Sequence, residues 1–233
     1  MKVKVVARRS VDMAMAVAMV VLMAHGAMSD VAHEVLGMAT FGLFVAHHIL
    51  NAGWHSAYFR KPRFDGISVV DGLLFAVMIG AAVSSVFVSK KVFTFTHIEG
   101  GLFARRLHAC ATAWCFVLAA IHLGLHLDLA GFGAVLDWTG RWPKFDRWLR
   151  VSAVSAVAGY GAYGIFVHGL PERLAMYYAY SFWPEERNWL LYSDMVAVLC
   201  FFSCSASLAS RLFRMSGKKK SRTGSVRSRE DEA

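Results

Sequence analysis

The sequence has few of the residues that water-soluble domains carry on their surfaces. Only 18% of its 233 residues are charged and 57% are hydrophobic, and the mean hydropathy is +0.45. Only four prolines occur, and no stretch alternates apolar and polar residues as the strands of a membrane barrel do. The composition therefore argues against a soluble domain and predicts an all-α fold.

The motifs that mark many enzymes and metal proteins are also missing. The four cysteines form neither paired C-x-x-C motifs nor the C-x-x-C-H motif that attaches a c-type haem. No Ser/His/Asp set, phosphate-binding loop or pair of carboxylates appears. An independent catalytic function has little support, and we expect the cysteines to pack as small apolar side chains.

Long apolar runs dominate the chain instead. A helix needs about 20 apolar residues to cross a bilayer, and we find six candidates, at about 11–28, 31–52, 67–89, 104–127, 151–169 and 189–212. The first run follows a basic head, as in a signal peptide, but its apolar body is long and we interpret it as a retained helix. We expect a polytopic bundle of six transmembrane helices in the cell membrane, forming one domain over residues 1–212.

Basic residues set the expected orientation of this bundle. If the N-terminus is cytoplasmic and all six runs cross, nineteen of the 25 Lys and Arg residues lie on the cytoplasmic side. The positive-inside rule then predicts an N-in, C-in topology. Residues 213–233 form a basic tail, which we expect to be disordered and to lie near anionic lipid. Because this tail explains much of the net charge of +9, we expect no nucleic-acid partner.

Histidines gather in the second and fourth runs, although an ionisable side chain in hydrocarbon is costly and marks a functional site. His33 and His47 lie in the second run, His108 and His122 in the fourth, and both pairs are 14 residues apart. Fourteen residues of helix advance ~21 Å and return to within about 40° of the starting direction. Since both helices cross the bilayer in the same direction, His33 should be level with His108, and His47 with His122.

Two levels of paired imidazoles are the ligand set that two six-coordinate haems require. Cofactor sites in helical bundles are built from side chains on facing helices, and most residues between these histidines are small. We therefore expect two non-covalent b-type haems between helices two and four, with His33, His47, His108 and His122 as axial ligands of the iron. Iron with both axial positions filled suits electron transfer rather than bond-making chemistry.

Three more residues are weaker candidates for this site. His126 lies one turn beyond His122, and could replace it as a ligand or contact a haem propionate. His48 points about 100° away from its neighbour His47, and the matched spacing favours His47. Arg105 lies one turn before His108, where its guanidinium could pair with a propionate or with a lipid headgroup.

The same residues resemble the flavinylation-associated cytochromes, a family of membrane b-type cytochromes from bacteria and archaea. The pattern H-E-x-x-G…H-x-x-x-N runs from His33 to Asn51, followed by A-R-x-L-H at 104–108 and H-x-G-x-H at 122–126. The resemblance is good over about 12–127 and looser beyond. It implies the same four haem ligands. A more distant resemblance is to the cytochrome b subunits of formate dehydrogenase and nickel–iron hydrogenase.

The resemblance also implies a role and partners. Electrons would enter from a quinol pool or a cytoplasmic donor and leave to an extracytosolic flavoprotein, and a quinone could bind as a further cofactor. We expect a partner to dock on the outer segment 92–106. The chain would then be an electron-transfer subunit, which leaves open whether it belongs to a quinol-linked oxidoreductase and in which direction electrons flow.

Two other interpretations remain open. The first is a transition-metal transporter, because His122 and His126, one turn apart, suit zinc or copper, and His47 and His48 could join them. No carboxylate cluster or broken helix accompanies them in the sequence. The second is a non-redox membrane anchor, in which the histidines only pack helices together and the chain holds a partner complex.

Overall fold

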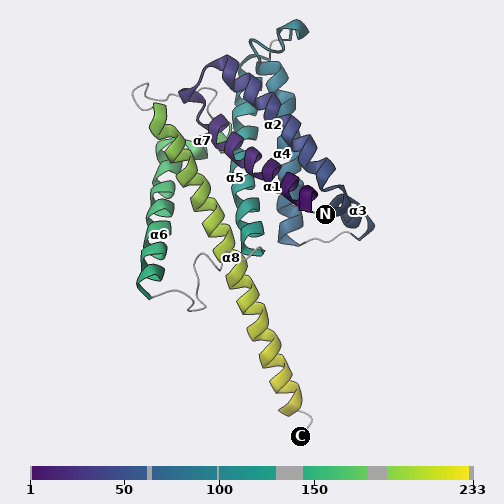
Figure 1. Ribbon diagram of the computed structural model, residues 1–233, viewed down its shortest axis with the longest axis vertical. Coiled ribbons are helices and arrows are strands. Elements are labelled where there is room, and N and C mark those ends of the chain that lie inside the picture. Colours follow the sequence, from purple (N-terminus) through teal and green to yellow (C-terminus); the bar gives the residue numbers. More distant parts are fainter. Residues whose placement is uncertain (1, 62–64, 99, 130–143, 178–187, 231–233) are drawn as a thin grey trace.

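A computed structural model describes residues 2–61, 65–98, 100–129, 144–177 and 188–230, and in these ranges the chain is helical without any strand (Figure 1). All helices except the single turn α7 are free of proline, which would interrupt their backbone hydrogen bonds. The described α-helices, in chain order, are α1 (Lys2–Met23), α2 (Asp30–Leu50), α3 (Ala52–Arg60), α4 (Gly66–Val88), α5 (Gly101–Leu129), α6 (Lys144–Val167), α7 (Leu170–Leu174) and α8 (Asn188–Glu230), and two short 3-10 helices lie at η1 (His25–Ala27) and η2 (Thr94–Thr96).

Three of the described helices are long and apolar enough to cross a membrane. These are Gly66–Val88 in α4, Gly101–His126 in α5 and Trp189–Arg214 in α8. They coincide with the runs predicted at 67–89, 104–127 and 189–212. The run at 151–169 falls on a shorter apolar helix, Val151–Val167. The runs at 11–28 and 31–52 fall on α1 and α2, which are not among these three helices.

The basic tail differs from its expectation. The sequence predicts disorder from residue 213, but the backbone of α8 remains helical to Glu230. Extending an existing helix adds one hydrogen bond for each residue fixed and needs no new nucleus. Lys and Arg, which are frequent here, also have good helix propensity. In Figure 1 this end of α8 projects beyond the rest of the bundle.

Helix α5 lies at the centre of the bundle. It packs along α4 and α8 and also contacts α1 and α7, whereas α2 packs along α1 and α6 packs along α8. One buried apolar cluster joins α1, α5, α7 and α8 around Phe116 and Val198. A second joins α2, α4 and α5 around Phe44, Met78 and Cys115. The helix that carries His108 and His122 is therefore held from several sides.

Small residues let α5 and α6 approach α8 closely. A methyl group on Gly124 of α5 would lie 2.1 Å from the carbonyl oxygen of Ser203, and one on Gly161 of α6 would lie 2.1 Å from that of Ala197. The Ser203 hydroxyl also donates to the Ala120 carbonyl oxygen at 2.8 Å. Close backbone approach and hydrogen bonds between helices are the usual means of association in lipid, where burial of apolar surface gives little driving force.

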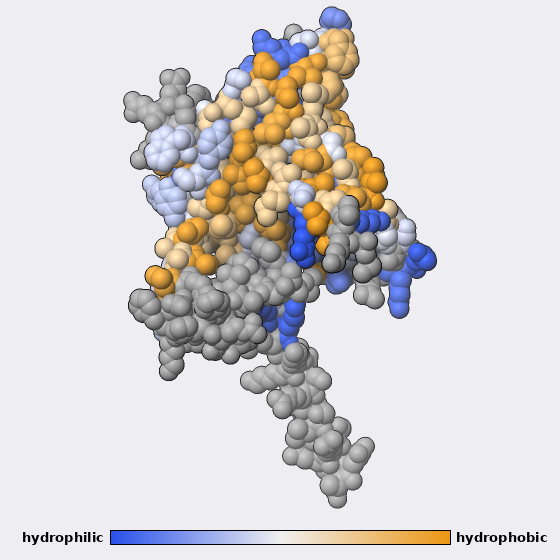
Figure 2. Space-filling view, viewed as in Figure 1, coloured by the Kyte–Doolittle hydropathy of each residue, from blue (hydrophilic) through white to orange (hydrophobic). Residues whose placement is uncertain are grey.

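The outer surface of the bundle is apolar over most of the face drawn in Figure 2, with hydrophilic residues gathered toward its ends. Large apolar side chains are exposed along α2 and α4, including Val35, Phe41, Leu73 and Val83. A soluble protein rarely exposes such a continuous apolar surface. This surface fits contact with the hydrocarbon of a bilayer.

Candidate functional site: two histidine clusters

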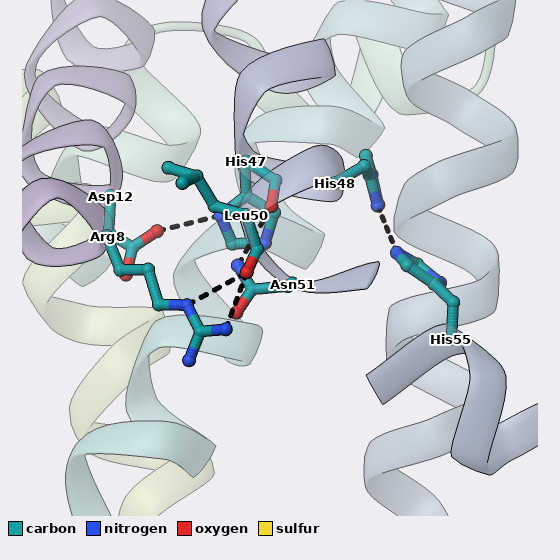
Figure 3. A network of polar contacts seen from close by, with 7 residues as sticks. All are labelled: Arg8, Asp12, His47, His48, Leu50, Asn51 and His55. Atoms are coloured by element: carbon teal, nitrogen blue, oxygen red, sulfur yellow. Dashed lines mark hydrogen bonds and ion pairs between the residues drawn. The ribbon is translucent and has the colours of Figure 1, made fainter. Parts of the chain in front are cut away.

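The first cluster lies where α1 begins and α2 ends. Asp12 of α1 contacts His47 of α2, with 2.7 Å between the carboxylate Oδ1 and the imidazole Nδ1. Arg8, one turn earlier on α1, donates through Nε and Nη2 to the Leu50 carbonyl oxygen at 2.9 and 2.6 Å (Figure 3). A guanidinium suits a helix C-terminus, where unpaired carbonyls carry partial negative charge. Two contacts thus hold the end of α2 that carries His47.

A second carboxylate–histidine pair completes this cluster from α4 and α5. Asp71 Oδ1 lies 2.7 Å from Nδ1 of His122, and the rings of His122 and His126 are 4.3 Å apart between centroids. His126 is close enough to Asp71, Asp12 and His47 for their charges to interact. Four helices therefore converge on what we call the first cluster, namely Asp12, His47, Asp71, His122 and His126.

The second cluster lies toward the other ends of α2 and α5. His108 Nδ1 lies 3.1 Å from the Ser84 hydroxyl of α4. His33 is close enough to His108 and to His25 for their charges to interact, and the rings of His25 and His33 meet edge to face at 4.4 Å. The second cluster is thus His25, His33, Ser84 and His108. The structure gathers His33 with His108 at one level, and His47 with His122 and His126 at the other.

These partners determine which ring nitrogen carries the proton. A carboxylate can only accept, so the Nδ1 atoms of His47 and His122 must donate to Asp12 and Asp71. The Ser84 hydroxyl lies 3.0 Å from the Ala81 carbonyl oxygen and 3.1 Å from His108 Nδ1, and it can donate its single proton to only one of them. In His47 and His122, Nε2 then has a free lone pair, which is the form of imidazole that binds a metal ion.

His33 has a different environment. Its Nδ1 is buried and has no hydrogen-bond partner. A buried polar atom without a partner costs free energy, and such an atom in a native structure calls for an explanation such as an ion or group that binds there. The donor set of the two clusters thus fits coordination of metal by imidazole, from helices two and five of the structure.

An aromatic side chain separates the two clusters. Phe44 of α2 is buried against Met78 and Ala81 of α4 and against Ala111 and Cys115 of α5. Helix α2 makes its extended backbone contact with α1 rather than with α5. Phe44 therefore bridges from α2 to α5 between the histidine levels.

Of the three weaker candidates of the sequence analysis, His126 belongs to the first cluster, whereas His48 contacts other residues. His48 points away from His47, and its Nδ1 lies 2.8 Å from Nε2 of His55 in α3 (Figure 3). Its ring also packs edge to face against Phe44 and Phe75. Arg105 is half-buried in the first turns of α5, one turn before His108.

Glu34, next to His33, anchors the loop that follows α4. Its carboxylate accepts hydrogen bonds from the Ser89 hydroxyl at 2.6 Å and from the backbone N–H groups of Lys90, Lys91 and Val92 at 2.9, 3.2 and 2.8 Å. Four donors on one carboxylate tie the beginning of α2 to the end of α4. The anchor fixes His33 relative to the helix that carries Ser84.

A further polar network connects α6 and α8. Asp194 accepts from the Tyr160 hydroxyl at 2.6 Å, and its other oxygen lies 2.9 Å from Nε2 of His168. The side chains of His168 and Asp194 are 12% and 14% exposed. Burial of this degree makes the contacts important for holding α6 on α8.

The sequence analysis missed the residues that orient the histidines. Asp12, Asp71 and Asp194 are single carboxylates in apolar runs, and an ionisable residue there is itself a signal of function. Ser84 gave no such signal, because serine is common in transmembrane helices. The pairing of each residue with its histidine depends on which helices are neighbours, and this the sequence did not reveal.

The described residues thus form an all-helical structure with three candidate transmembrane helices and two histidine clusters at contacts between helices. No family model, curated protein or solved structure matches the chain.

Proposed function

We propose that the protein transfers electrons across a membrane through two b-type haems, each held between α2 and α5. The observation that carries this proposal is the grouping of histidines from these two helices at two separate levels. His33 and His108 interact at one level, and His47, His126 and His122 at the other. The resemblance to flavinylation-associated cytochromes adds support from the sequence.

Each residue has a defined task in this proposal. His33 and His108 bind one haem iron, and His47 and His122 bind the other, with His126 as the residue that could take the place of His122. Asp12 and Asp71 orient two of these rings by accepting from Nδ1, and the Ser84 hydroxyl orients a third through its contact with His108 Nδ1. Arg105 provides a positive charge for a propionate. Haem supplies a one-electron carrier, and two imidazoles leave its iron no open position for oxygen.

The proposed topology has six membrane crossings with both ends of the chain in the cytoplasm. The three apolar helices support it, and α1, α2 and α6 complete the count. The basic residues Lys4, Arg8, Arg9, Arg60 and Lys61 then lie on the cytoplasmic side, near the first cluster. The first cluster is therefore the inner site, and the second cluster, near Lys90 and Lys91, is the outer one.

The partners follow from the same resemblance. The bilayer surrounds the apolar surface, a quinol pool or a cytoplasmic reductant donates electrons, and an extracytosolic flavin-carrying protein accepts them. Segment 92–106 is the proposed docking surface for the flavin-carrying protein. The chain then acts as an electron-transfer subunit, with quinone as a further ligand.

A visible spectrum of the purified chain tests this function directly. We expect a low-spin b-type spectrum and about two haems per chain by pyridine haemochrome analysis, with no covalent attachment. The His47→Ala and His108→Ala variants should each retain one haem. As a matched control, His97→Asn alters an exposed histidine in the left-handed backbone region (φ 52°), which Asn tolerates, and should retain both.

Two results contradict the proposal. One is purified, folded protein without haem after expression in cells that supply it. The other is a His47→Ala, His108→Ala double variant that still binds two haems. Folding of each variant is checked by circular dichroism and size-exclusion chromatography in detergent.

A second candidate function, transport of a transition metal, is supported by one observation. Asp71, His122 and His126 each offer a ligand atom, and these atoms lie within 4.8 Å of one another. The sequence alone gave no carboxylate cluster with these histidines, since Asp71 comes from the neighbouring helix. Imidazole and carboxylate ligands suit zinc. Stoichiometric zinc without a Soret band, lost in Asp71→Ala, would favour this function over electron transfer.

A further inference from the structure

The two clusters differ in the groups that contact their histidines. In the first cluster both α2 and α5 histidines contact a carboxylate, at 2.7 Å in each case. In the second cluster His108 contacts a neutral hydroxyl at 3.1 Å, and the Nδ1 of His33 has no hydrogen-bond partner. The difference lies in the groups that touch the α2 and α5 histidines. Carboxylates contact both of these histidines at the first cluster, whereas at the second cluster Asp30 contacts His25 at 3.5 Å and Glu34 binds the loop after α4.

We propose that Asp12 and Asp71 are positioning residues that make the inner haem the lower-potential haem, so that electrons are driven from the cytoplasmic side to the outer side. This inference rests on the proposed function and adds to it the order of the two haem potentials and the residues that set it. It assigns to the carboxylates a task beyond holding the rings in place.

The physical reason lies in the charge of oxidised iron. An imidazole that donates Nδ1–H to a carboxylate becomes a more basic ligand, and a stronger electron donor stabilises the ferric state more than the ferrous state. The nearby negative charge also stabilises the ferric state, because it attracts the additional positive charge of oxidised iron. This attraction is strong where little water screens it. Hydrogen bonds and charge around the ligands are recognised means by which proteins set haem potentials.

Other charges near the clusters must be weighed against this effect. Arg8 adjoins the first cluster, but its guanidinium binds the Leu50 carbonyl oxygen at the negative end of α2. His126 also faces Asp71 and Asp12. At the second cluster, His25 acts electrostatically on both His33 and His108, and the carboxylates of Asp30 and Glu34 act on His33. Asp30 is paired with His25 at 3.5 Å and with Lys90 at 4.0 Å, and Glu34 accepts four hydrogen bonds from Ser89 and the loop after α4. Because these two carboxylates are partnered elsewhere and His33 Nδ1 has no hydrogen-bond partner, the balance favours a lower potential at the first cluster.

Each transfer step moves one electron from the inner donor through the two haems to the outer acceptor. A quinol or cytoplasmic reductant on the inner side loses the electron, and the flavin of the outer partner gains it. No bond within the chain is made or broken. The proton balance belongs to the donor and the acceptor on their own sides of the membrane.

Single-haem variants provide the primary experiment. Full-length wild-type protein in nanodiscs is titrated anaerobically while the haem spectrum is recorded, which gives two midpoint potentials. His108→Ala should leave one haem with a midpoint near the lower wild-type value. His47→Ala should leave one near the higher value. The reverse assignment overturns the inference while leaving the two-haem function intact, whereas absence of haem overturns the function itself.

Removal of the carboxylate charge provides the second experiment. Asp71→Asn keeps an oxygen that can accept from His122 Nδ1 but loses the negative charge, so the lower midpoint should rise and the higher should stay. Asp71→Glu should restore a low value. Asp194→Asn is the matched control, because Asp194 binds His168 and Tyr160 between α6 and α8, and should shift neither midpoint.

Two outcomes of this second experiment count against the inference. One is a rise confined to the higher midpoint, and the other is no shift in either midpoint when haem content is unchanged. If Asp71→Asn loses the inner haem, Asp12→Asn tests the same site through His47. If both Asp71→Asn and Asp12→Asn lose the inner haem, the midpoint potentials of the single-haem variants His108→Ala and His47→Ala test the inference. A purely structural role for the carboxylates predicts that any variant that keeps both haems also keeps both midpoint potentials.

Discussion

Gly124 lies between His122 and His126, and the close packing of α5 on α8 depends on its lack of a side chain. We predict that Gly124→Ala destabilises the protein and displaces the histidines beside it. An added methyl carbon would lie 2.1 Å from the Ser203 carbonyl oxygen and 2.8 Å from the Ser203 carbonyl carbon and Cα. These are backbone atoms of a packed helix, so relief requires the two helices to separate.

The size of the effect follows from these contacts. A normal contact with oxygen requires a separation larger by about 1 Å. That shift would stretch the Ser203–Ala120 hydrogen bond from 2.8 Å to beyond hydrogen-bonding distance. Overpacking costs about 1–3 kcal/mol, and the lost hydrogen bond about 1 kcal/mol. Alanine recovers about 1 kcal/mol of helix propensity, which leaves a net loss of about 2 kcal/mol.

Thermal unfolding in detergent, followed by circular dichroism, measures this loss. For a chain of this length, about 2 kcal/mol lowers Tm by roughly 4–8 °C. Gly80→Ala in α4 is the matched control, because a methyl group there would have no atom within 4 Å, and it should leave Tm unchanged or slightly raised. A Gly124→Ala protein as stable as the Gly80→Ala protein would refute the reasoning from helix packing.

Other contacts give predictions of the same kind. Gly161→Ala should lower the unfolding free energy by about 1–2 kcal/mol, while Gly159→Ala, with open space around it, should not; equal Tm values for the two would contradict this. Glu34→Gln should weaken the anchor of the loop after α4 by about 1–3 kcal/mol, seen as faster hydrogen exchange of amides 90–92; unchanged exchange would assign the anchor to other contacts. Asp194→Ala should cost about 1–3 kcal/mol, because it removes the acceptor of His168; retention of wild-type Tm would show that the network does not stabilise the bundle.

The helices and the two histidine levels could be anticipated because they follow from local pattern. Apolar runs of transmembrane length identified α4, α5 and α8, and the shared spacing of 14 residues placed histidines at both ends of two helices. Such inferences require only the periodicity of a helix. They do not require knowledge of which helices are neighbours.

The partners of the histidines could not be anticipated from the sequence, because they depend on which helices are neighbours. Whether Asp71 meets His122 depends on the rotation and height of α4 against α5, and small residues at helix crossings set both. The N-terminal helix is a similar case, because its contact with α2 brings Asp12 to His47 and Arg8 to Leu50. The helical tail differed from expectation because composition alone does not show that a packed helix precedes it.

The two carboxylates of the first cluster should not contribute equally to the proposed difference in haem potential. The side chain of Asp71 is 14% exposed, whereas that of Asp12 is 51% exposed. Water screens a charge in proportion to its access, so the same 2.7 Å contact is worth more at Asp71. Asp71→Asn should therefore raise the lower midpoint potential by more than Asp12→Asn does, and the double variant should approach the sum of the two shifts, since each acts through a different histidine. Redox titration of the three variants in nanodiscs measures both relations. A larger shift from Asp12→Asn would mean that burial does not set the strength of these contacts, and that the charge near α1 reaches the iron by another route.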